Sequence, residues 1–302
     1  MTDLYKSCRL CPRNCGINRL NGKAGFCGET SELRVATAVI HRGEEPPLVG
    51  EGGSGTIFIS GCNLGCSFCQ NYQISQGKPG IGKTVSPEEF ADICKALRDK
   101  GAENINIVTG SHAIPAIIEG FEAARKAGVQ IPILWNSSAY EKPEAIELLK
   151  DYVDIYLPDL KTLDSKIAEK FFNAPDYPDA AVAAILKMID SAGSVIIRHL
   201  ILPGFLDSTR SVLRWFKENA KDRAMLSLMT QYTPIQDRKN EKPMPKRYLS
   251  REEYETVLYW LKEFDIEDGF CQELVTGSDW LPDFRRYNPF SSELSVPVWQ
   301  PD

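Results

Sequence analysis

Six apolar runs of strand length alternate with amphipathic segments of helical length, and this alternation limits the possible folds more than any other feature of the chain. The runs are TIFIS (56–60), INIVT (105–109), IPILWN (131–136), VDIYLP (153–158), SVIIRHLI (194–201) and LSLMTQY (226–232). Helices are predicted near 86–100, 114–127, 143–151, 179–192, 209–220 and 251–265. Apolar strands separated by helices predict a parallel sheet covered on both faces. Six such units favour a partial or complete barrel over a doubly wound open sheet, which produces a similar pattern.

Two terminal regions lie outside this alternation and divide the chain. Residues 1–54 carry four cysteines without strong periodicity, so we predict a small N-terminal module stapled by metal. Residues 55–265 form the predicted barrel. Residues 266–302 include a stretch rich in proline and aromatic residues, which predicts an extended C-terminal arm. We favour an arm that covers the outside of the barrel over a lid on the site.

Composition and charge restrict the class of protein. The chain has 302 residues, of which 43% are hydrophobic and 25% charged, as in soluble globular proteins. No stretch approaches the roughly 18 apolar residues of a membrane span, and the N-terminus has no secretory signal pattern. These features predict a cytoplasmic protein without a membrane partner. The net charge of −6 is spread along the chain, so no nucleic acid partner is expected.

The nine cysteines are unevenly placed, since seven lie within the first 69 residues. An odd number in a reducing compartment fits metal-bound thiolates better than a disulfide framework. Cys94 shares one face of a predicted helix with Phe90, Ile93 and Leu97, which predicts a buried structural thiol. Cys271 receives the same interpretation by default.

Cys62, Cys66 and Cys69 follow the first predicted strand in a C-x3-C-x2-C pattern. Three thiolates leave one iron of a [4Fe–4S] cluster without a protein ligand, and a molecule with an amine and a carboxylate can chelate that iron. The alternative is a three-cysteine zinc site completed by a distant fourth ligand, as in a zinc-binding adaptor without catalysis.

A second group of cysteines lies in the N-terminal module. Cys8, Cys11, Cys15 and Cys27 form a C-x2-C-x3-C-x11-C pattern. Four thiols close in sequence can complete a tetrahedral site by themselves, so a structural zinc ion and an auxiliary iron–sulfur cluster both fit. Metal would also stabilise a segment that has few apolar residues of its own.

With these motifs the chain resembles the radical S-adenosylmethionine (SAM) superfamily, whose signature has an aromatic residue before the third cysteine, here Phe68. It is most similar to the stand-alone homologues of pyruvate formate-lyase activating enzyme. The similar elements are CRLCPRNCGINRLNGKAGFCG, SGTIFISGCNLGCSFCQNYQIS, VDIYLPDLK, VIIRHLILPG and LMTQYTP, between residue 8 and about residue 234. The N-terminal element also resembles a second radical SAM group, encoded beside AMMECR-type and Memo-type proteins.

The resemblance implies a fold and a chemistry. The fold would be a partial (β/α)6 TIM-like barrel. Cys62, Cys66 and Cys69 would bind a [4Fe–4S] cluster whose open iron chelates SAM, and reductive cleavage of SAM would give a 5′-deoxyadenosyl radical that abstracts hydrogen from a substrate. A low-potential electron donor of the flavodoxin or ferredoxin type and anaerobic conditions are implied. The expected substrate is a glycyl-radical enzyme or another polypeptide, with a small metabolite as the alternative.

The resemblance also implies residues that contact SAM at successive strand ends. Besides Phe68, these are Gly110, Ser111, His112, Asn136, Asp159, Lys161, Arg198 and Gln231. Activating enzymes usually carry Gly-Gly-Glu after the second strand, and this chain has Gly110-Ser111-His112 instead, without the glutamate. The role of His112 could equally be structural. His199 follows Arg198 in a strand, so it faces the opposite side and is predicted to be structural.

Residues 77–84, GKPGIGKT, match the phosphate-loop pattern of nucleotide-binding proteins. In that motif the Lys-Thr pair opens a helix, which points its N–H groups at the phosphates. Here the helix signals come later, with Ser86 as N-cap, Pro87 at the first position and Glu89 completing a capping box. We therefore interpret the segment as a glycine-rich connector and do not expect an NTPase.

Overall fold

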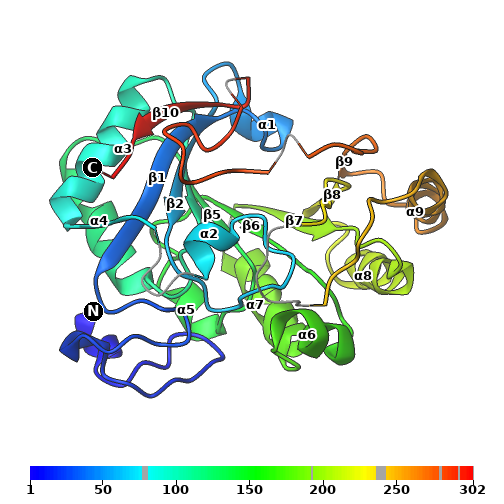
Figure 1. The fold of residues 1–302 in the computed structure, drawn as a ribbon, viewed down its shortest axis with the longest axis horizontal. Helices are drawn as coiled ribbons and strands as arrows, with labels where there is room; N and C mark the ends of the chain where they lie inside the picture. Colours follow the sequence, from blue (N-terminus) through cyan, green and yellow to red (C-terminus); the bar gives the residue numbers. More distant parts are fainter. Residues whose placement is uncertain (77–80, 192, 236–242, 279–280, 292, 302) are drawn as a thin grey trace.

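A computed structural model describes residues 1–76, 81–191, 193–235, 243–278, 281–291 and 293–301 (Figure 1). Its strands are β1 Leu33–His41, β2 Ser54–Ile59, β3 Lys83–Val85, β4 Ile105–Val108, β5 Ile133–Ser137, β6 Ile155–Pro158, β7 Ser194–Leu200, β8 Met225–Met229, β9 Gly269–Cys271 and β10 Ser295–Trp299. Its helices are η1 Thr2–Tyr5, η2 Arg19–Asn21, α1 Pro46–Val49, α2 Tyr72–Ser75, α3 Pro87–Asp99, α4 Ile114–Lys126, α5 Pro143–Glu147, α6 Ser165–Phe172, α7 Tyr177–Ser191, α8 Leu206–Asn219 and α9 Arg251–Glu263.

One mixed sheet organises the molecule, in the order β10-β1-β2-β4-β5-β6-β7-β8-β9, with β3 beside β1. The strands from β2 to β9 run parallel, whereas β1 is antiparallel to β2, β3 and β10. Among the described residues β9 pairs only with β8, so the sheet stays open. The six predicted parallel strands and the partial (β/α)6 barrel are confirmed.

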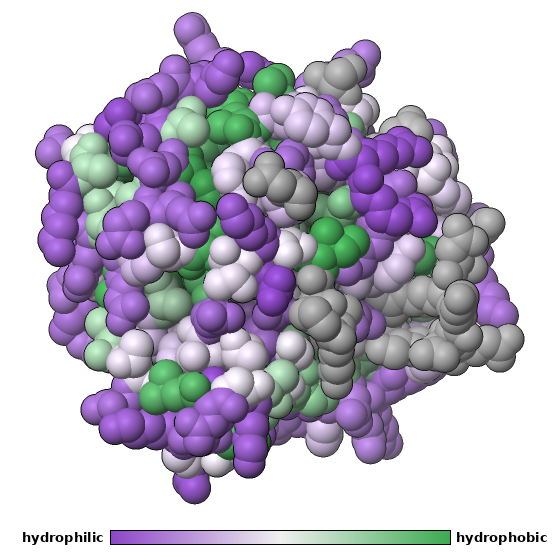
Figure 2. All heavy atoms as spheres, turned by 60° about the vertical axis from the view of Figure 1, so that its left-hand side comes forward, coloured by the Kyte–Doolittle hydropathy of each residue, from purple (hydrophilic) through white to green (hydrophobic). Residues whose placement is uncertain are grey.

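The helices cover the outer face of the curved sheet, as Figure 1 shows for α3, α4, α6, α7 and α8. Aliphatic and aromatic side chains of strands and helices form a large core between the two layers, and strands such as β2 and β4 are buried along their whole length. The face that Figure 2 brings forward is mostly hydrophilic, with apolar side chains in separate patches. The amphipathic pattern of the sequence is thus satisfied by burial of one face of each helix.

Residues on both sides of the predicted barrel take part in the sheet, which differs from the predicted boundaries. β1 lies within the segment assigned to the N-terminal module and pairs with β2 over most of its length. β9 and β10 belong to the segment assigned to the C-terminal arm, and β10 extends the sheet beyond β1. The cysteine-rich part that precedes β1 is therefore shorter than the predicted module.

The predicted start of α3 is confirmed. The Ser86 hydroxyl accepts a hydrogen bond from Glu89 N at 3.2 Å, and Ser86 N donates to Glu89 Oε2 at 2.8 Å. Lys83 and Thr84 lie in β3 and open no helix. Residues 77–80 of the phosphate-loop match are outside the described residues.

Removal of the Ser86 hydroxyl is expected to destabilise the protein modestly. Ser86→Ala leaves a backbone N–H at the start of α3 without its acceptor, so the free energy of unfolding should fall by about 1 kcal/mol. Urea denaturation followed by circular dichroism measures this change. Ser165→Ala is the matched control, because Ser165 is exposed at the first position of α6 and Asp164 caps that helix. Equal effects of the two substitutions would contradict a capping role for Ser86.

Two further features were not predicted or differ from the prediction, namely helix α6 and the exposure of Cys271. α6 has no counterpart among the predicted helices. Cys94 is buried as predicted, whereas Cys271 is exposed at the edge strand β9. All nine cysteines lie in the described part of the chain, and all are free. No helix within that part is long and apolar enough to cross a membrane.

Candidate active site

A cavity of about 240 Å³ opens at the ends of the parallel strands and extends as far as Glu44, in the segment after β1. All three cysteines of the predicted cluster loop line it, together with side chains from the ends of the other strands. The predicted residues found on its wall are Cys62, Cys66, Phe68, Cys69, Asn136, Asp159, Lys161, Arg198 and Gln231. The carboxyl ends of parallel strands are the usual place for ligand sites in such folds.

The loop after β2 owes its shape to two glycines. Gly61 and Gly65 have φ values of 82° and 73°, which side chains disfavour. A Cβ atom on Gly61 would also lie 2.5 Å from Glu29 Cγ, so only glycine fits there. Within the loop, Leu64 N donates to Cys62 Sγ at 3.3 Å. Burial raises the pKa of the Cys62 thiol, and this hydrogen bond acts in the opposite direction.

The guanidinium of Arg13 ties the cluster loop to its surroundings. It donates to the carbonyl oxygens of Asn63 (2.9 Å) and Leu64 (3.1 Å) in the loop. It also donates to the carbonyl oxygens of Phe172 (3.0 Å) and Asn173 (2.6 Å) at the end of α6. One side chain therefore fixes the N-terminal segment, the loop and α6 relative to one another.

Phe68, expected at the cofactor, has a packing role as well. Its ring makes edge-to-face contacts with Phe171, Phe172 and Tyr232 at centroid distances of 5.8, 5.9 and 6.0 Å. Such aromatic contacts add to the energy of burial. The ring thus anchors the loop between Cys66 and Cys69 while part of it reaches the cavity.

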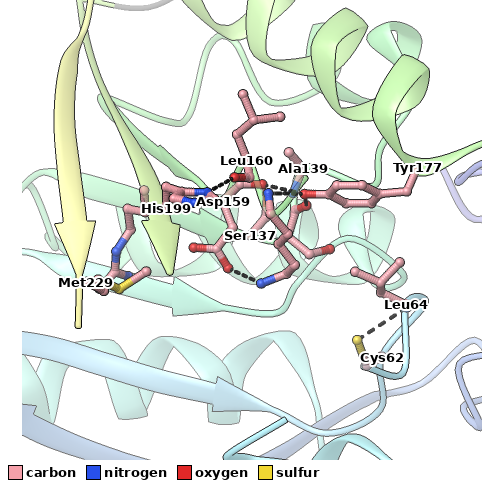
Figure 3. Close-up of polar contacts among 12 residues, drawn as sticks. Cys62, Leu64, Ser137, Ala139, Asp159, Leu160, Tyr177, His199 and Met229 are labelled. Atoms are coloured by element: carbon pink, nitrogen blue, oxygen red, sulfur yellow. Dashed lines mark hydrogen bonds and ion pairs between the residues drawn. The ribbon is translucent and has the colours of Figure 1, made fainter. Parts of the chain in front are cut away.

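The segment after β6 supplies a charged pair. Asp159 Oδ2 and Lys161 Nζ lie 2.6 Å apart. Burial alone would lower the pKa of Lys161, but Asp159 and the Cys66 sulfur raise it above its usual value, so the ammonium stays charged. The Tyr177 hydroxyl of α7 donates to Asp159 O at 2.7 Å and accepts from Lys161 N at 3.0 Å. Figure 3 shows Tyr177 reaching this segment from α7, across from Cys62.

Arg198 and His199 point to opposite sides of β7, as predicted. Arg198 lines the cavity, with Nε 3.0 Å from Glu45 Oε1 and Nη2 3.3 Å from Glu44 Oε2. His199 Nδ1 forms a hydrogen bond with Leu160 O at 2.7 Å, which Figure 3 shows. His199 Nε2 forms a second one with Thr209 Oγ1 of α8 at 3.0 Å. Burial lowers the pKa of His199 to about 4, which fits a neutral structural histidine.

The segment after β4 lies elsewhere than predicted. Thr109 adopts a φ of 67° and lines the cavity, whereas Gly110, Ser111 and His112 do not. A Cβ atom on Gly110 would lie 2.5 Å from the Trp135 ring, on the side of the sheet that faces the helices. His112 lines a small pocket of the N-terminal cysteines, and burial and the Arg19 cation lower its pKa to about 3.

The N-terminal cysteines line that second pocket together. Cys8, Cys11, Cys15 and Cys27 surround it, and the buried guanidinium of Arg19 closes one side. Arg19 is 1% exposed and donates to the carbonyl oxygens of Thr30 and His112 and to Cys8 Sγ at 3.7 Å. No carboxylate among the described residues forms an ion pair with it. The donor set of four soft sulfurs beside a buried cation suits a metal centre with negatively charged thiolate ligands.

The two cysteine groups are in direct contact through the backbone, since Cys62 N donates to Cys27 O at 3.2 Å. In neither group do the described side chains converge on one position for a single ion, because no set of three or more His, Cys, Asp or Glu residues is placed in that way. The three sulfurs on the cavity wall do match the donor set of a three-cysteine iron–sulfur site with one open iron.

Sequence reasoning missed part of the cavity wall. His41 at the end of β1 and Gly43 and Glu44 after it line the cavity. Pro282, Phe290 and Leu294 line it from the C-terminal arm. The arm therefore reaches the site, although the prediction favoured a cover on the outside of the barrel. The adjacent carboxylates of Glu44 and Glu45 could have indicated a polar site in this segment. No strand was predicted before them, so they were not expected at a strand end.

Comparison with known proteins gives a consistent result. Residues 56–216, more than half of the chain, match the family described as the Radical SAM superfamily. An uncharacterised protein of Methanocaldococcus jannaschii is 34% identical over 272 residues, which cover 88% of this chain and 77% of the relative.

Two solved structures share the fold. Streptococcus suis SuiB bound to S-adenosylmethionine aligns with a TM-score of 0.51 at 17% identity, over 70% of this chain and 48% of SuiB. The chain thus spans about half the length of SuiB. Methylornithine synthase aligns with a TM-score of 0.51 at 18% identity, over 80% of this chain and 74% of the synthase. At such identities the likeness concerns the fold.

Proposed function

The chain belongs to the radical SAM superfamily, and we propose on that basis that it cleaves SAM reductively at a [4Fe–4S] cluster held by Cys62, Cys66 and Cys69. The observation that carries the proposal is the shared cavity. The three thiols and the polar side chains of four further strand ends face one space. When bound, the cluster and SAM supply the one-electron chemistry and a 5′-deoxyadenosyl radical.

The protein's own residues would bind and orient SAM. The Lys161 ammonium, fixed by Asp159 at 2.6 Å, lies beside the cysteines, where it suits the SAM carboxylate. Asn136 and Gln231 offer amide groups on the same wall. Gln231 is oriented by Gln272, whose Nε2 donates to Gln231 Oε1 at 3.2 Å. Apolar side chains such as Phe58 and Met229 would limit the access of water to the cavity.

The substrate and partners are part of the proposal. Resemblance to activating enzymes favours a glycyl-radical enzyme or another polypeptide as the hydrogen donor. Cluster reduction calls for a low-potential protein of the flavodoxin or ferredoxin type. Free thiols at all nine cysteines fit the reducing, oxygen-poor cytoplasm that this chemistry needs.

We extend the proposal to a metal centre at Cys8, Cys11, Cys15 and Cys27, as an auxiliary iron–sulfur cluster or as a zinc ion, on which the four sulfurs would have to converge further than they do in this structure. The buried Arg19 supports it, because its partners are carbonyl oxygens, Cys8 Sγ and the Tyr5 ring, with no carboxylate among the described residues, and a buried cation without an anion is costly. Neutral thiols leave that charge uncompensated, whereas thiolates bound to metal provide the missing negative charge.

Formation of 5′-deoxyadenosine tests the main proposal. The protein, purified anaerobically and reconstituted with iron and sulfide, is expected to bind at least one [4Fe–4S] cluster and to convert SAM to 5′-deoxyadenosine with dithionite. Chromatography of the products and the absorbance of the cluster measure both results. A protein that takes up zinc and no iron, and leaves SAM intact, would contradict the proposal and favour an adaptor without catalysis.

A further inference from the structure

We propose that the end of the cavity remote from the cysteines is a binding subsite for a positively charged amine of the substrate, with Glu44 as the carboxylate that binds it. This inference rests on the proposed function and specifies the class of substrate. It assigns a role to residues that neither the cysteine motifs nor the predicted SAM contacts explain.

The path of the chain places Glu44 opposite the cysteines. β1 runs antiparallel to β2, and its last residue, His41, pairs with Ser54 at the start of β2. The cluster loop follows Ile59 at the other end of β2. Glu44 thus approaches the cavity from the edge where β2 begins, while Cys62 enters where it ends, and both line the same space.

The contacts of Glu44 leave hydrogen-bond acceptors unused. Its side chain is 7% exposed, and Oε1 accepts from Asn106 Nδ2 at 3.0 Å. Oε2 lies 3.3 Å from Arg198 Nη2, yet it has no hydrogen-bond partner within the described residues. The same holds for Oδ1 of Asn106, a residue of β4 that is completely buried. Buried acceptors without donors are costly, and in the described part of this site they outnumber the one donor that lacks a hydrogen bond, Arg198 Nε, so this site calls for a ligand that donates.

The charges at this end point to a cation. Two buried carboxylates, Glu44 and Glu45, face the single guanidinium of Arg198. His41 beside them adds no charge at neutral pH, because burial lowers its pKa in spite of the neighbouring Glu44. The group therefore carries a net negative charge away from water, which a ligand with one positive charge and N–H donors would balance.

The wall between the two ends is apolar. Asn106 pairs with Thr56, and two residues nearer the cysteines Phe58 pairs with Val108. Phe58 and Val108 both line the cavity, and Phe290 of the C-terminal arm packs on Phe58 at 5.4 Å between ring centroids. An alkylammonium group matches this arrangement. Its ammonium would lie at Glu44, and its carbon chain would extend past Phe58 toward the cysteines, where hydrogen abstraction is proposed.

The ammonium group of SAM itself does not meet these requirements. In the proposed site SAM chelates the open iron through its amine and carboxylate, so its own amine belongs at the cysteine end. Glu44 approaches from the edge where β2 begins, and we therefore assign it to another molecule. A free amine and the lysine side chain of a polypeptide share the required chemistry.

Calorimetric titration of the cluster-loaded, SAM-bound protein tests the subsite. We expect n-butylammonium to bind at least about tenfold more tightly than n-butanol, the difference that one charge-assisted hydrogen bond produces. Glu44→Gln should remove this preference without changing SAM affinity. Glu255→Gln, at an exposed residue of α9, should keep it. Nα-acetyl-lysine methylamide, which keeps a free side-chain ammonium group, distinguishes the two kinds of substrate. Tighter binding than n-butylammonium indicates a polypeptide, and weaker binding indicates a small amine.

Several results would overturn the inference. Equal affinity of the wild-type protein for the amine and the alcohol would do so without any variant. Persistence of the preference in Glu44→Gln would exclude Glu44 as its cause, and a loss of SAM affinity in that variant would assign Glu44 to SAM instead. Absence of 5′-deoxyadenosine formation with an intact amine preference would contradict the proposed function and leave the subsite standing.

Discussion

Replacement of Cys66 by alanine is expected to reduce 5′-deoxyadenosine formation by at least about a thousandfold. Cys66 lies in the middle of the cluster loop. It is buried, and it lines the cavity beside Lys161. With only Cys62 and Cys69 left, one more iron lacks a protein ligand, so the cluster should be lost. Iron and sulfide analysis and product chromatography on the reconstituted variant measure the effect.

Cys94→Ala is the matched control for this experiment. Cys94 is also buried, but it lies in the hydrophobic core on α3 and does not line the cavity. It should therefore retain the cluster and SAM cleavage, with only a modest loss of stability from the missing sulfur. Cys66→Ala should also keep metal at Cys8, Cys11, Cys15 and Cys27, since those ligands are unchanged. Full SAM cleavage by Cys66→Ala would contradict a catalytic cluster at the loop.

The repeating part of the fold was predictable because its signals are local. Each parallel strand is a continuous apolar run followed by an amphipathic helix, and burial between two layers imposes that pattern on each unit. β1 gave no such signal. Its sequence LRVATAVIH mixes small, polar and apolar residues, yet almost all of them are buried, because β1 lies between β2 and β10. Pairing with a strand from the end of the chain depends on contacts that no local window contains.

The site was predictable to the extent that strand ends determine it. Asn136, Asp159, Lys161 and Arg198 line the cavity because each lies within the last three residues of a parallel strand or soon after its end. The same rule failed after β4. There the left-handed conformation of Thr109, with its N–H bonded to Asn136 O at 3.0 Å, turns the chain so that the next residues leave the cavity. A single backbone angle decided this, and no residue type in the sequence indicated it.

Glu44 is a cavity residue that the sequence did not reveal, for a similar reason. Its place in the cavity follows from the antiparallel direction of β1, which carries the segment after His41 to the beginning of β2. The sequence provides two adjacent carboxylates, but their partners Asn106 and Arg198 lie 62 residues and more away. Only the assembled sheet brings these charges together.

Removal of the Arg13 side chain is expected to destabilise the protein more than any other substitution of a partly exposed residue considered above. Arg13→Ala leaves four carbonyl oxygens of the loop and of the α6 end without their donor. Hydrogen bonds to charged groups contribute about 1.5–3 kcal/mol each, and partial exposure reduces that value here. We expect the free energy of unfolding to fall by about 3–4 kcal/mol, with a lower melting temperature and loss of cluster uptake.

Comparison with Arg13→Lys and Arg251→Ala separates geometry from charge. Lysine keeps the positive charge but cannot reach four carbonyl oxygens with a planar fork, so most of the loss should persist. Arg251 is 79% exposed and lies 3.9 Å from Glu255, so its removal should change the melting temperature little. Calorimetric melting and iron analysis measure both effects. Stability close to wild type in Arg13→Ala would mean that Cys62 and Cys66 are held by the loop's own glycine turns and by Phe68, and that the contacts of Arg13 are dispensable.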